Sequence, residues 1–211
     1  MLRYLGIIIL TLGVLGALAL WPEEAPEDFT TREKAIISQA KQRDWPVVVF
    51  GDSVTELAVL PDVCGQPTLN AGIAGQKASG LERVAAETLR HIDPELVILA
   101  LGTNDAWDGR TTDRDTFLAT MRRLIDLAEK DGARVLLIKP GEVSGFGKGY
   151  VFDNTRIRAI GDDLDTLGTA TGPIPPLTSE TSDDGVHPNA AGYRQWTALL
   201  DDACEAHDKP N

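Results

Sequence analysis

The chain has 211 residues, of which 43% are hydrophobic and 25% are charged. This length and composition allow one domain with a substantial core, and they exclude a fibrous or disordered chain. A formal net charge of −12 excludes nucleic acid as a partner, because phosphate binding requires a basic surface. The three histidines and two cysteines lack metal-ligand spacing, so we expect neither a metal nor another cofactor.

The amino-terminal segment is predicted to be separate from the fold. Residues 5–20 carry no charge and would form a helix of roughly 24 Å, slightly shorter than the roughly 30 Å hydrocarbon core of a membrane. Tyr4 and Trp21 suit the two membrane interfaces, so residues 4–21 would be the inserted part. Arg3 precedes this segment and acidic residues follow it, so the positive-inside rule places the rest of the chain outside the cytoplasm, in a periplasm or at the cell surface.

Residues 1–21 are therefore predicted to be a membrane anchor or a signal peptide. A cleavable signal peptide is the rival interpretation, because Ala17 and Ala19 match the small-x-small cleavage pattern. Leu20 and Trp21 continue the apolar run beyond that point, which favours an uncleaved anchor. Residues 22–45 follow as a polar, proline-bearing spacer, and the folded domain is expected over residues 46–208.

Elements of the domain are expected in a regular order. The spacer includes a short helix that carries Ala35, Ile36, Ile37 and Ala40 on one side. Short apolar runs then predict strands at residues 47–50, 68–70, 96–101, 135–138 and 171–174. A 3.6-residue spacing predicts helices around 81–89, 117–128 and 189–207, with Thr112 and Asp115 as a capping box before the second. Apolar strands that alternate with helices indicate an α/β fold with a parallel sheet covered on both faces.

Ligands bind to such sheets beyond the carboxyl ends of the strands, and short polar motifs lie at those positions. Gly51-Asp52-Ser53 follows the first strand and precedes a helix start, where the helix dipole favours developing negative charge. A serine at this point is also a common helix N-cap. The second strand leads into Gly72 and Gly75, which serve as turn residues or let backbone N–H groups approach a ligand.

Two further motifs follow later strands. The third strand leads into Gly102-Thr103-Asn104-Asp105, in which Asn104 is either a turn residue or an uncharged donor for an oxyanion. Asp184-Gly185-Val186-His187-Pro188 precedes the last helix, and the carboxylate of Asp184 can reach the ring of His187 across the turn. That bond would fix the tautomer, so that the other ring nitrogen can take a proton from a serine.

Together and in this order, the four motifs resemble those of the SGNH/GDSL hydrolase superfamily, over roughly residues 46–207. The resemblance implies that Ser53 is the nucleophile, His187 the base and Asp184 the acid. It also implies an oxyanion hole formed by the N–H groups of Ser53 and Gly75 and the side-chain amide of Asn104. The implied fold is flavodoxin-like and three-layered, with a five-stranded parallel sheet in the order 2-1-3-4-5.

The resemblance implies a serine esterase that needs no metal or cofactor. The expected substrates are short-acyl or acetyl esters of a glycan, or a lysophospholipid. Acyl transfer to a sugar would use the same residues and is the alternative, while a non-catalytic tethered binding module is a third interpretation. Trp107 is a candidate wall of the site, and the glycine-rich residues 140–149 are either a mobile loop beside it or a long connector.

Cys64 and Cys204 are predicted to form a disulfide, which the environment of an exported domain permits. In the 2-1-3-4-5 arrangement, the helix after Ser53 and the last helix are neighbours on one face. Both run from the carboxyl edge of the sheet to the opposite edge, so the two cysteines should lie close together there. Two buried free thiols are the alternative.

Overall fold

The protein is described here by a computed structural model that covers residues 29–168 and 170–207. One compact unit begins at Thr31. The predicted anchor or signal peptide, residues 1–21, lies outside the described residues. Within the described part, no helix is both long enough and apolar enough to span a membrane. In chain order the elements are α2 (Thr31–Ala40), β1 (Val47–Gly51), α3 (Ser53–Glu56), β2 (Asp62–Val63), β3 (Gln66–Gly72), α4 (Ala78–Leu89), β4 (Leu96–Ala100), η1 (Asn104–Ala106), α5 (Arg114–Glu129), β5 (Arg134–Ile138), η2 (Gly147–Val151), α6 (Asn154–Leu164), β6 (Ala170–Thr171) and α7 (Ala190–His207).

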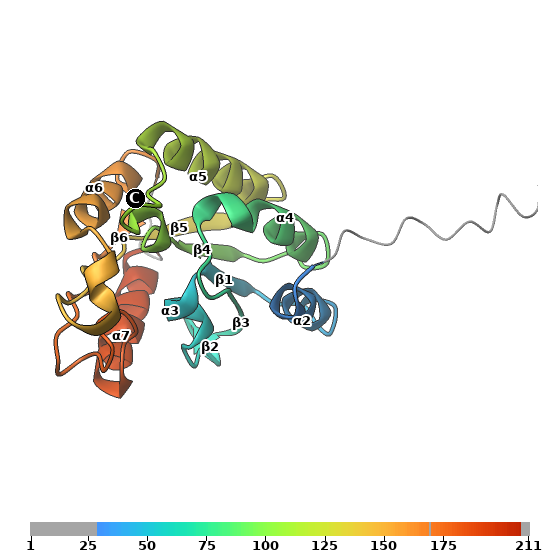
Figure 1. The fold of residues 1–211 in the computed structure, drawn as a ribbon. Coiled ribbons are helices and arrows are strands. Elements are labelled where there is room, and N and C mark those ends of the chain that lie inside the picture. Colours follow the sequence, from blue (N-terminus) through green and yellow to red (C-terminus); the bar gives the residue numbers. More distant parts are fainter. Residues whose placement is uncertain (1–28, 169, 208–211) are drawn as a thin grey trace, which may run out of the picture. The chain divides into compact units, whose positions relative to one another are not determined.

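The sheet has six strands in the order β2-β3-β1-β4-β5-β6 (Figure 1). Five of them are parallel, and β1 lies between β3 and β4, with Val47 opposite Thr68 on one side and Leu96 on the other. The short β2 is antiparallel to β3 and adds one strand to the edge of the sheet. Without β2, the chain order across the sheet is 2-1-3-4-5, as expected.

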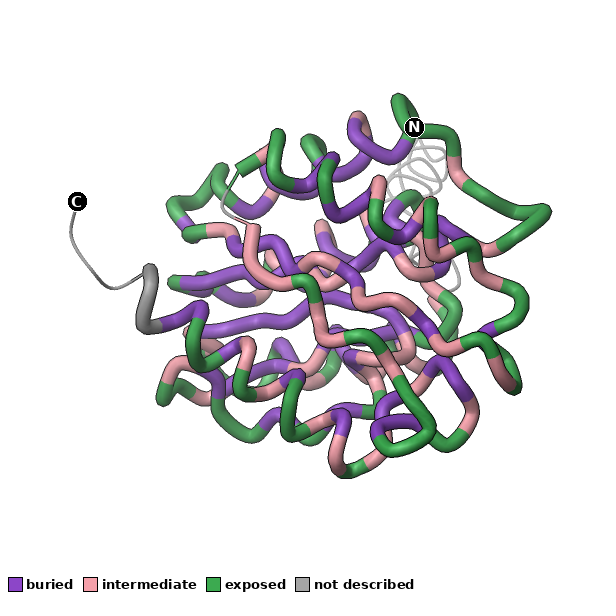
Figure 2. The backbone as a smooth tube through the Cα atoms, turned by 90° about the vertical axis from the view of Figure 1, so that its left-hand side faces the viewer, coloured by how far each residue is buried: buried purple, intermediate pink, exposed green. Residues whose placement is uncertain are grey.

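Helices cover the sheet on both faces, which explains why its strands are apolar along their whole length. All five residues of β1 are buried. Val47 and Val49 belong to a core that includes Trp196 and Leu200 of α7. The opposite face lies under α4 and α5, and Figure 1 shows these helices on the other side of the sheet from α3 and α7. Figure 2 shows the strands as a buried layer between the outer helices.

Several elements differ from the expectations. The predicted spacer overlaps the folded unit, because α2 packs against α4 and β3 and buries Ile36 and Ala40. The predicted capping box at Thr112 is wrong, since Asp113 is the N-cap of α5 and accepts the N–H of Thr116. The hydroxyl group of Thr112 instead donates a hydrogen bond to the carboxylate of Asp105.

Helix α6 was not predicted, although its buried positions follow a helical spacing. They include Ile157, Ile160, Gly161 and Leu164, which follow the i, i+3, i+4, i+7 spacing of one helix face. Polar and charged residues fill the rest of this helix, so the apolar signal is sparse. The predicted strand near 171–174 corresponds to the two-residue β6.

The predicted disulfide is confirmed. Cys64 and Cys204 are 140 residues apart in sequence, and their Cα atoms are 5.3 Å apart. The path to Cys64 differs from the expectation, because α3 ends after four residues and Cys64 lies between β2 and β3. That position is at the amino edge of the sheet, where α7 reaches β2.

Candidate active site

A tight turn at the end of β1 places Ser53 at the carboxyl edge of the sheet. Strand β1 ends at Gly51 and α3 begins two residues later. A Cβ atom on Gly51 would lie 2.0 Å from the hydroxyl oxygen of Thr55, so only glycine allows the helix to follow so closely. Asp52 caps the helix, because its carboxylate accepts the N–H of Val54 at 2.9 Å. The turn therefore presents Ser53 at the amino terminus of α3.

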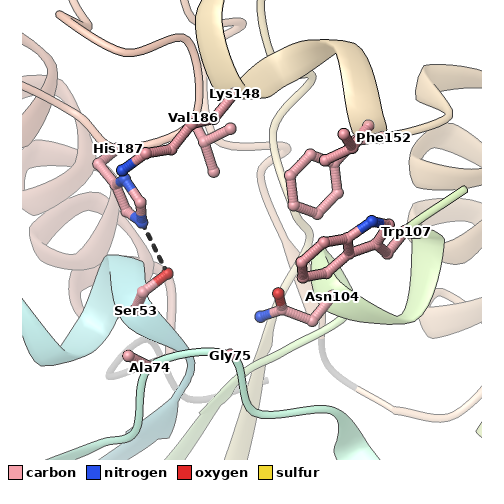
Figure 3. A pocket seen from close by; sticks show the side chains of 10 residues that line it. Ser53, Ala74, Gly75, Asn104, Trp107, Lys148, Phe152, Val186 and His187 are labelled. Carbon is pink, nitrogen blue, oxygen red and sulfur yellow. Dashed lines mark hydrogen bonds between the residues drawn. The ribbon is translucent and has the colours of Figure 1, made fainter. Parts of the chain in front are cut away.

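The loop before α7 brings the two other predicted catalytic groups to this serine. His187 Nε2 lies 3.0 Å from Ser53 Oγ (Figure 3). His187 Nδ1 lies 2.7 Å from Asp184 Oδ2. The other oxygen of Asp184 accepts the backbone N–H groups of Val186 and His187, at 3.0 and 2.8 Å. These bonds fix the carboxylate relative to the ring, so Ser53, His187 and Asp184 form one continuous hydrogen-bonded chain.

The contacts of Asp184 keep it ionised. Burial by itself would raise the pKa of this carboxyl. The backbone and ring N–H groups of His187, the N–H of Val186 and the ammonium of Lys148 outweigh that effect and hold its pKa well below the usual range. Asp184 is therefore a charged partner for the ring of His187 at neutral pH.

The three predicted oxyanion-hole residues line one cavity together with His187. Gly75 has φ +73°, a conformation that side chains rarely adopt, which explains glycine at this position. Gly72 plays a different part, because its N–H donates to Asn70 and a Cβ atom there would lie 2.2 Å from the backbone nitrogen of Glu56. Of the two glycines in this turn, Gly75 is the one that faces the cavity.

The side chain of Asn104 is held by buried acceptors at the bottom of the site. Its amide nitrogen is 3.2 Å from the carbonyl oxygen of Gln76 and 3.4 Å from Asp52 Oδ2. Burial raises the pKa of Asp52 to about 6, with smaller opposing effects from its hydrogen bond to Val54 and the nearby His187. Asp52 thus links the orientation of Asn104 to the cap of the helix that carries Ser53.

The cavity has a volume of about 410 Å³ and is mainly apolar. Trp107 and Phe152 form its wall opposite His187, with ring centroids 5.6 Å apart (Figure 3). The predicted wall residue Trp107 therefore does line the site. Phe152 and Lys148 were missed, because they come from η2 and its flank, where the sequence shows no periodic signal. The lining residues are Ser53, Ala74, Gly75, Asn104, Trp107, Lys148, Val151, Phe152, Val186 and His187.

The glycine-rich segment that follows β5 packs on the loop of Asp184. The N–H of Ser144 donates to the carbonyl of Gly185 at 3.0 Å, and the N–H of Lys148 donates to the carbonyl of Asp184 at 2.8 Å. Close glycine contacts accompany these bonds, since a Cβ atom on Gly149 would lie 1.8 Å from the carbonyl oxygen of Ser144. Residues 140–149 lead from β5 into η2 beside the site, and these contacts support the loop of Asp184.

This combination of fold and site defines a class of protein, the α/β hydrolytic enzymes with a serine at the edge of a parallel sheet. A family model, that of the GDSL-like lipase/acylhydrolase family, matches residues 49–195. The chain belongs to this family and is a carboxylic ester hydrolase of the SGNH/GDSL type. No curated protein is detectably similar in sequence.

Solved structures share the fold at low sequence identity. A lipase/acylhydrolase from Enterococcus faecalis is 25% identical over 78% of this chain and 97% of its own, with a TM-score of 0.65. A GDSL-like lipase from Bacteroides thetaiotaomicron is 20% identical over 83% of this chain and 98% of its own, with a TM-score of 0.66. An acetylxylan esterase from Geobacillus stearothermophilus is 15% identical over 78% and 96%, with a TM-score of 0.63.

Proposed function

We propose that the protein is a serine esterase that acts outside the cytoplasm and uses Ser53, His187 and Asp184. One observation carries the proposal: the hydrogen-bonded chain from Ser53 Oγ through the ring of His187 to Asp184, at the edge of a cavity. A serine hydroxyl is a weak nucleophile unless a base removes its proton. His187 is within hydrogen-bond distance of that proton, and Asp184 orients the ring.

The reaction proceeds in two halves. His187 accepts the proton of Ser53 while Oγ attacks the ester carbonyl. Negative charge then develops on the carbonyl oxygen. The N–H groups of Ser53 and Gly75 and the amide of Asn104 stabilise this charge. The proton then passes from His187 to the oxygen of the leaving alcohol, and the carbon–oxygen bond breaks. Water, deprotonated by the same ring, attacks the acyl-serine. His187 then returns that proton to Ser53 Oγ as the acyl–oxygen bond breaks and the acid is released.

The cavity defines where the two parts of an ester would lie. The leaving oxygen must be within reach of His187, so the acyl group points to the opposite side, where Trp107 and Phe152 form an apolar wall. The proposed substrates are short-acyl esters of a glycan or a lysophospholipid. The acetylxylan esterase of similar fold supports the first and the lipase/acylhydrolase structure the second.

The proposed location rests on the sequence of residues 4–21 and on the disulfide. An apolar segment preceded by Arg3 and followed by acidic residues favours export of the domain. Disulfides persist in oxidising compartments, and Cys64 and Cys204 form one. Both observations support an extracytoplasmic enzyme that is tethered to the membrane if the segment is retained.

Replacement of the nucleophile tests the proposal. Ser53→Ala is expected to abolish hydrolysis of nitrophenyl acetate and butyrate and to abolish labelling by a fluorophosphonate, while the thermal midpoint stays nearly unchanged. The wild-type protein should be labelled at Ser53, as identified by peptide mass. Activity within tenfold of the wild type in Ser53→Ala would exclude this serine as the nucleophile.

Asn104→Ala tests the oxyanion hole separately. Loss of one donor is expected to reduce kcat by roughly 10²–10³, because the amide acts on charge that develops only in the transition state. A change confined to KM would show instead that Asn104 binds the substrate before reaction. Steady-state kinetics with nitrophenyl butyrate distinguish these results.

A further inference from the structure

Lys148 places a solvent-accessible positive charge beside the proposed catalytic residues. It lies in η2, and its ammonium nitrogen is 3.0 Å from Asp184 Oδ2, the oxygen that also accepts the ring N–H of His187. Its side chain is nevertheless 68% exposed. Among the ten residues that line the cavity, Lys148 is the one that carries a full charge independently of the state of His187. A cation is thus held beside the reacting groups of an otherwise apolar cavity.

The ammonium lies on the side of the cavity where the alcohol must depart. His187 delivers the proton to the leaving oxygen, so that oxygen lies next to the ring. Figure 3 shows Lys148 and Val186 on the same side as His187, whereas Trp107 and Phe152 stand on the other side. Lys148 is therefore placed to contact the alcohol part of an ester and not its acyl part.

We propose that Lys148 is a specificity-determining residue that favours esters whose alcohol part carries an anionic group. This inference rests on the proposed function, because it assigns the alcohol to the side of His187. An ammonium has three donors, so Lys148 can keep its contact with Asp184 and bind a substrate anion at the same time. The flexible stem of lysine and its exposure allow the nitrogen to reach along the leaving group.

The surrounding negative charges give this cation a role in binding an anionic substrate. Asp184 is ionised beside the site, Asp52 lies buried beneath it, and the whole chain carries a formal charge of −12. An anionic alcohol would therefore be repelled without a local positive group. The shared chemistry is a carboxylate or phosphate on the alcohol, as in an acidic sugar or in the headgroup of a lysophospholipid.

Two matched pairs of esters test the inference and separate these sources. The first pair is 4-butyryloxybenzoate and its neutral methyl ester, and the second is butyrylglycerol phosphate and butyrylglycerol. In each pair the ratio of kcat/KM, anionic ester over neutral ester, is measured for the wild type and for Lys148→Gln. Intrinsic reactivity cancels when the two proteins are compared. Lys139→Gln is the control, since Lys139 also pairs with an aspartate, Asp165, but does not line the cavity.

We expect Lys148→Gln to lower the ratio about tenfold in at least one pair, as for the loss of a charged hydrogen bond that is partly exposed to solvent. The pair that responds identifies carboxylate or phosphate as the anion. Lys139→Gln should leave both ratios unchanged, and added salt should lower the wild-type ratio. Equal losses for the anionic and neutral esters would overturn the inference and make Lys148 a positioning residue for Asp184. Hydrolysis that persists in Ser53→Ala would refute the proposed function itself, whatever the ratios.

Discussion

At the residue scale, the contacts of two adjacent aspartates distinguish the proposed catalytic acid from its neighbour. Asp184 binds the ring of His187 and two backbone N–H groups. Asp183 is exposed, and its carboxylate lies 3.4 Å from the amide of Asn189. Both aspartates precede the same histidine in the sequence, and the spacing to His187 already favours Asp184. Their opposite environments favour Asp184 over Asp183 as the proposed catalytic acid.

Paired substitutions test this assignment. Asp184→Asn is expected to reduce kcat by roughly 10³–10⁴, because the amide can neither stabilise the imidazolium nor hold the productive tautomer. Asp183→Asn should leave kcat within about twofold, as is usual for a solvated surface group. Steady-state kinetics on both variants make the comparison, and the opposite ranking would contradict the assignment.

The raised pKa of Asp52 leads to a prediction about how the free energy of unfolding depends on pH. Burial raises the pKa of this carboxyl from 3.8 to about 6. Between these values the folded state keeps a proton that the unfolded state releases, so this group lowers stability as pH rises from 4 to 6. Asp52→Asn removes the titration and keeps a good N-cap side chain. The free energy of unfolding of the variant, relative to wild type, should therefore increase by about 1–3 kcal/mol between pH 4 and pH 7.

Urea unfolding at a series of pH values measures this difference. Contributions from titrating groups that do not interact with Asp52 cancel when the two proteins are compared at the same pH. A difference that stays constant from pH 4 to pH 7 would show that Asp52 does not carry the raised pKa. A free-energy difference that decreases as pH rises would show that the pKa of Asp52 is lowered, not raised, in the folded state.

At the element scale, the site depends on how η2 and its preceding loop pack on the loop of Asp184. Gly149 and Gly145 belong to the same glycine-rich segment, but their surroundings differ. A Cβ atom on Gly149 would overlap the carbonyl oxygen of Ser144, whereas one on Gly145 would have no atom within 4 Å. Neither glycine has a positive φ, so backbone conformation does not separate them.

Alanine at these two positions tests the support that η2 provides. Gly149→Ala is expected to lower kcat/KM at least tenfold, because displacement of η2 would shift Asp184 and the wall at Phe152. Gly145→Ala should leave kcat/KM within about twofold and serves as the matched control. Kinetics with nitrophenyl butyrate, together with thermal midpoints, provide the measurement. Equal effects of the two substitutions would argue against a supporting role of the segment.

At the scale of the whole molecule, the disulfide connects the edge of the sheet with the end of the last helix. Cys64 lies between β2 and β3, and Cys204 lies in α7, so the bridge closes a loop of 140 residues. Its main effect is expected on the unfolded chain, whose freedom it restricts. The proposed triad lies at the opposite edge of the sheet, so the bridge should contribute to stability much more than to catalysis.

The double variant Cys64→Ser, Cys204→Ser is expected to lose roughly 2–5 kcal/mol of unfolding free energy and to retain near-wild-type kcat at 25 °C. Urea unfolding in the presence and absence of a reductant is the measurement. Reductant should destabilise the wild type and leave the double variant unaffected. A wild-type unfolding curve that does not respond to reductant during unfolding would contradict a stabilising bridge.

The sequence by itself determined the class of fold, and it was sufficient to propose the catalytic groups. Strands such as Val47–Gly51 are buried on both faces, so they are apolar throughout and can be recognised without knowledge of their neighbours. Ser53, Asn104 and His187 lie directly after strands or before a helix, where local geometry already determines their setting. The 2-1-3-4-5 order came from the resemblance to a known family.

Only the tertiary structure decided the shape and the charge of the cavity. Phe152 and Lys148 reach the site through the packing of η2 on the loop of Asp184, a contact between segments more than 30 residues apart in sequence. No local pattern encodes such a contact, because it depends on which surfaces the folded sheet brings together. The resemblance to a known family had already favoured Gly75 over Gly72 for the oxyanion hole, and the structure supports that choice because Gly75 lines the cavity and Gly72 does not. The residues proposed to carry the chemistry lie in short motifs that can be recognised locally in the sequence. The residues that form the rest of the cavity come together only through contacts between distant segments.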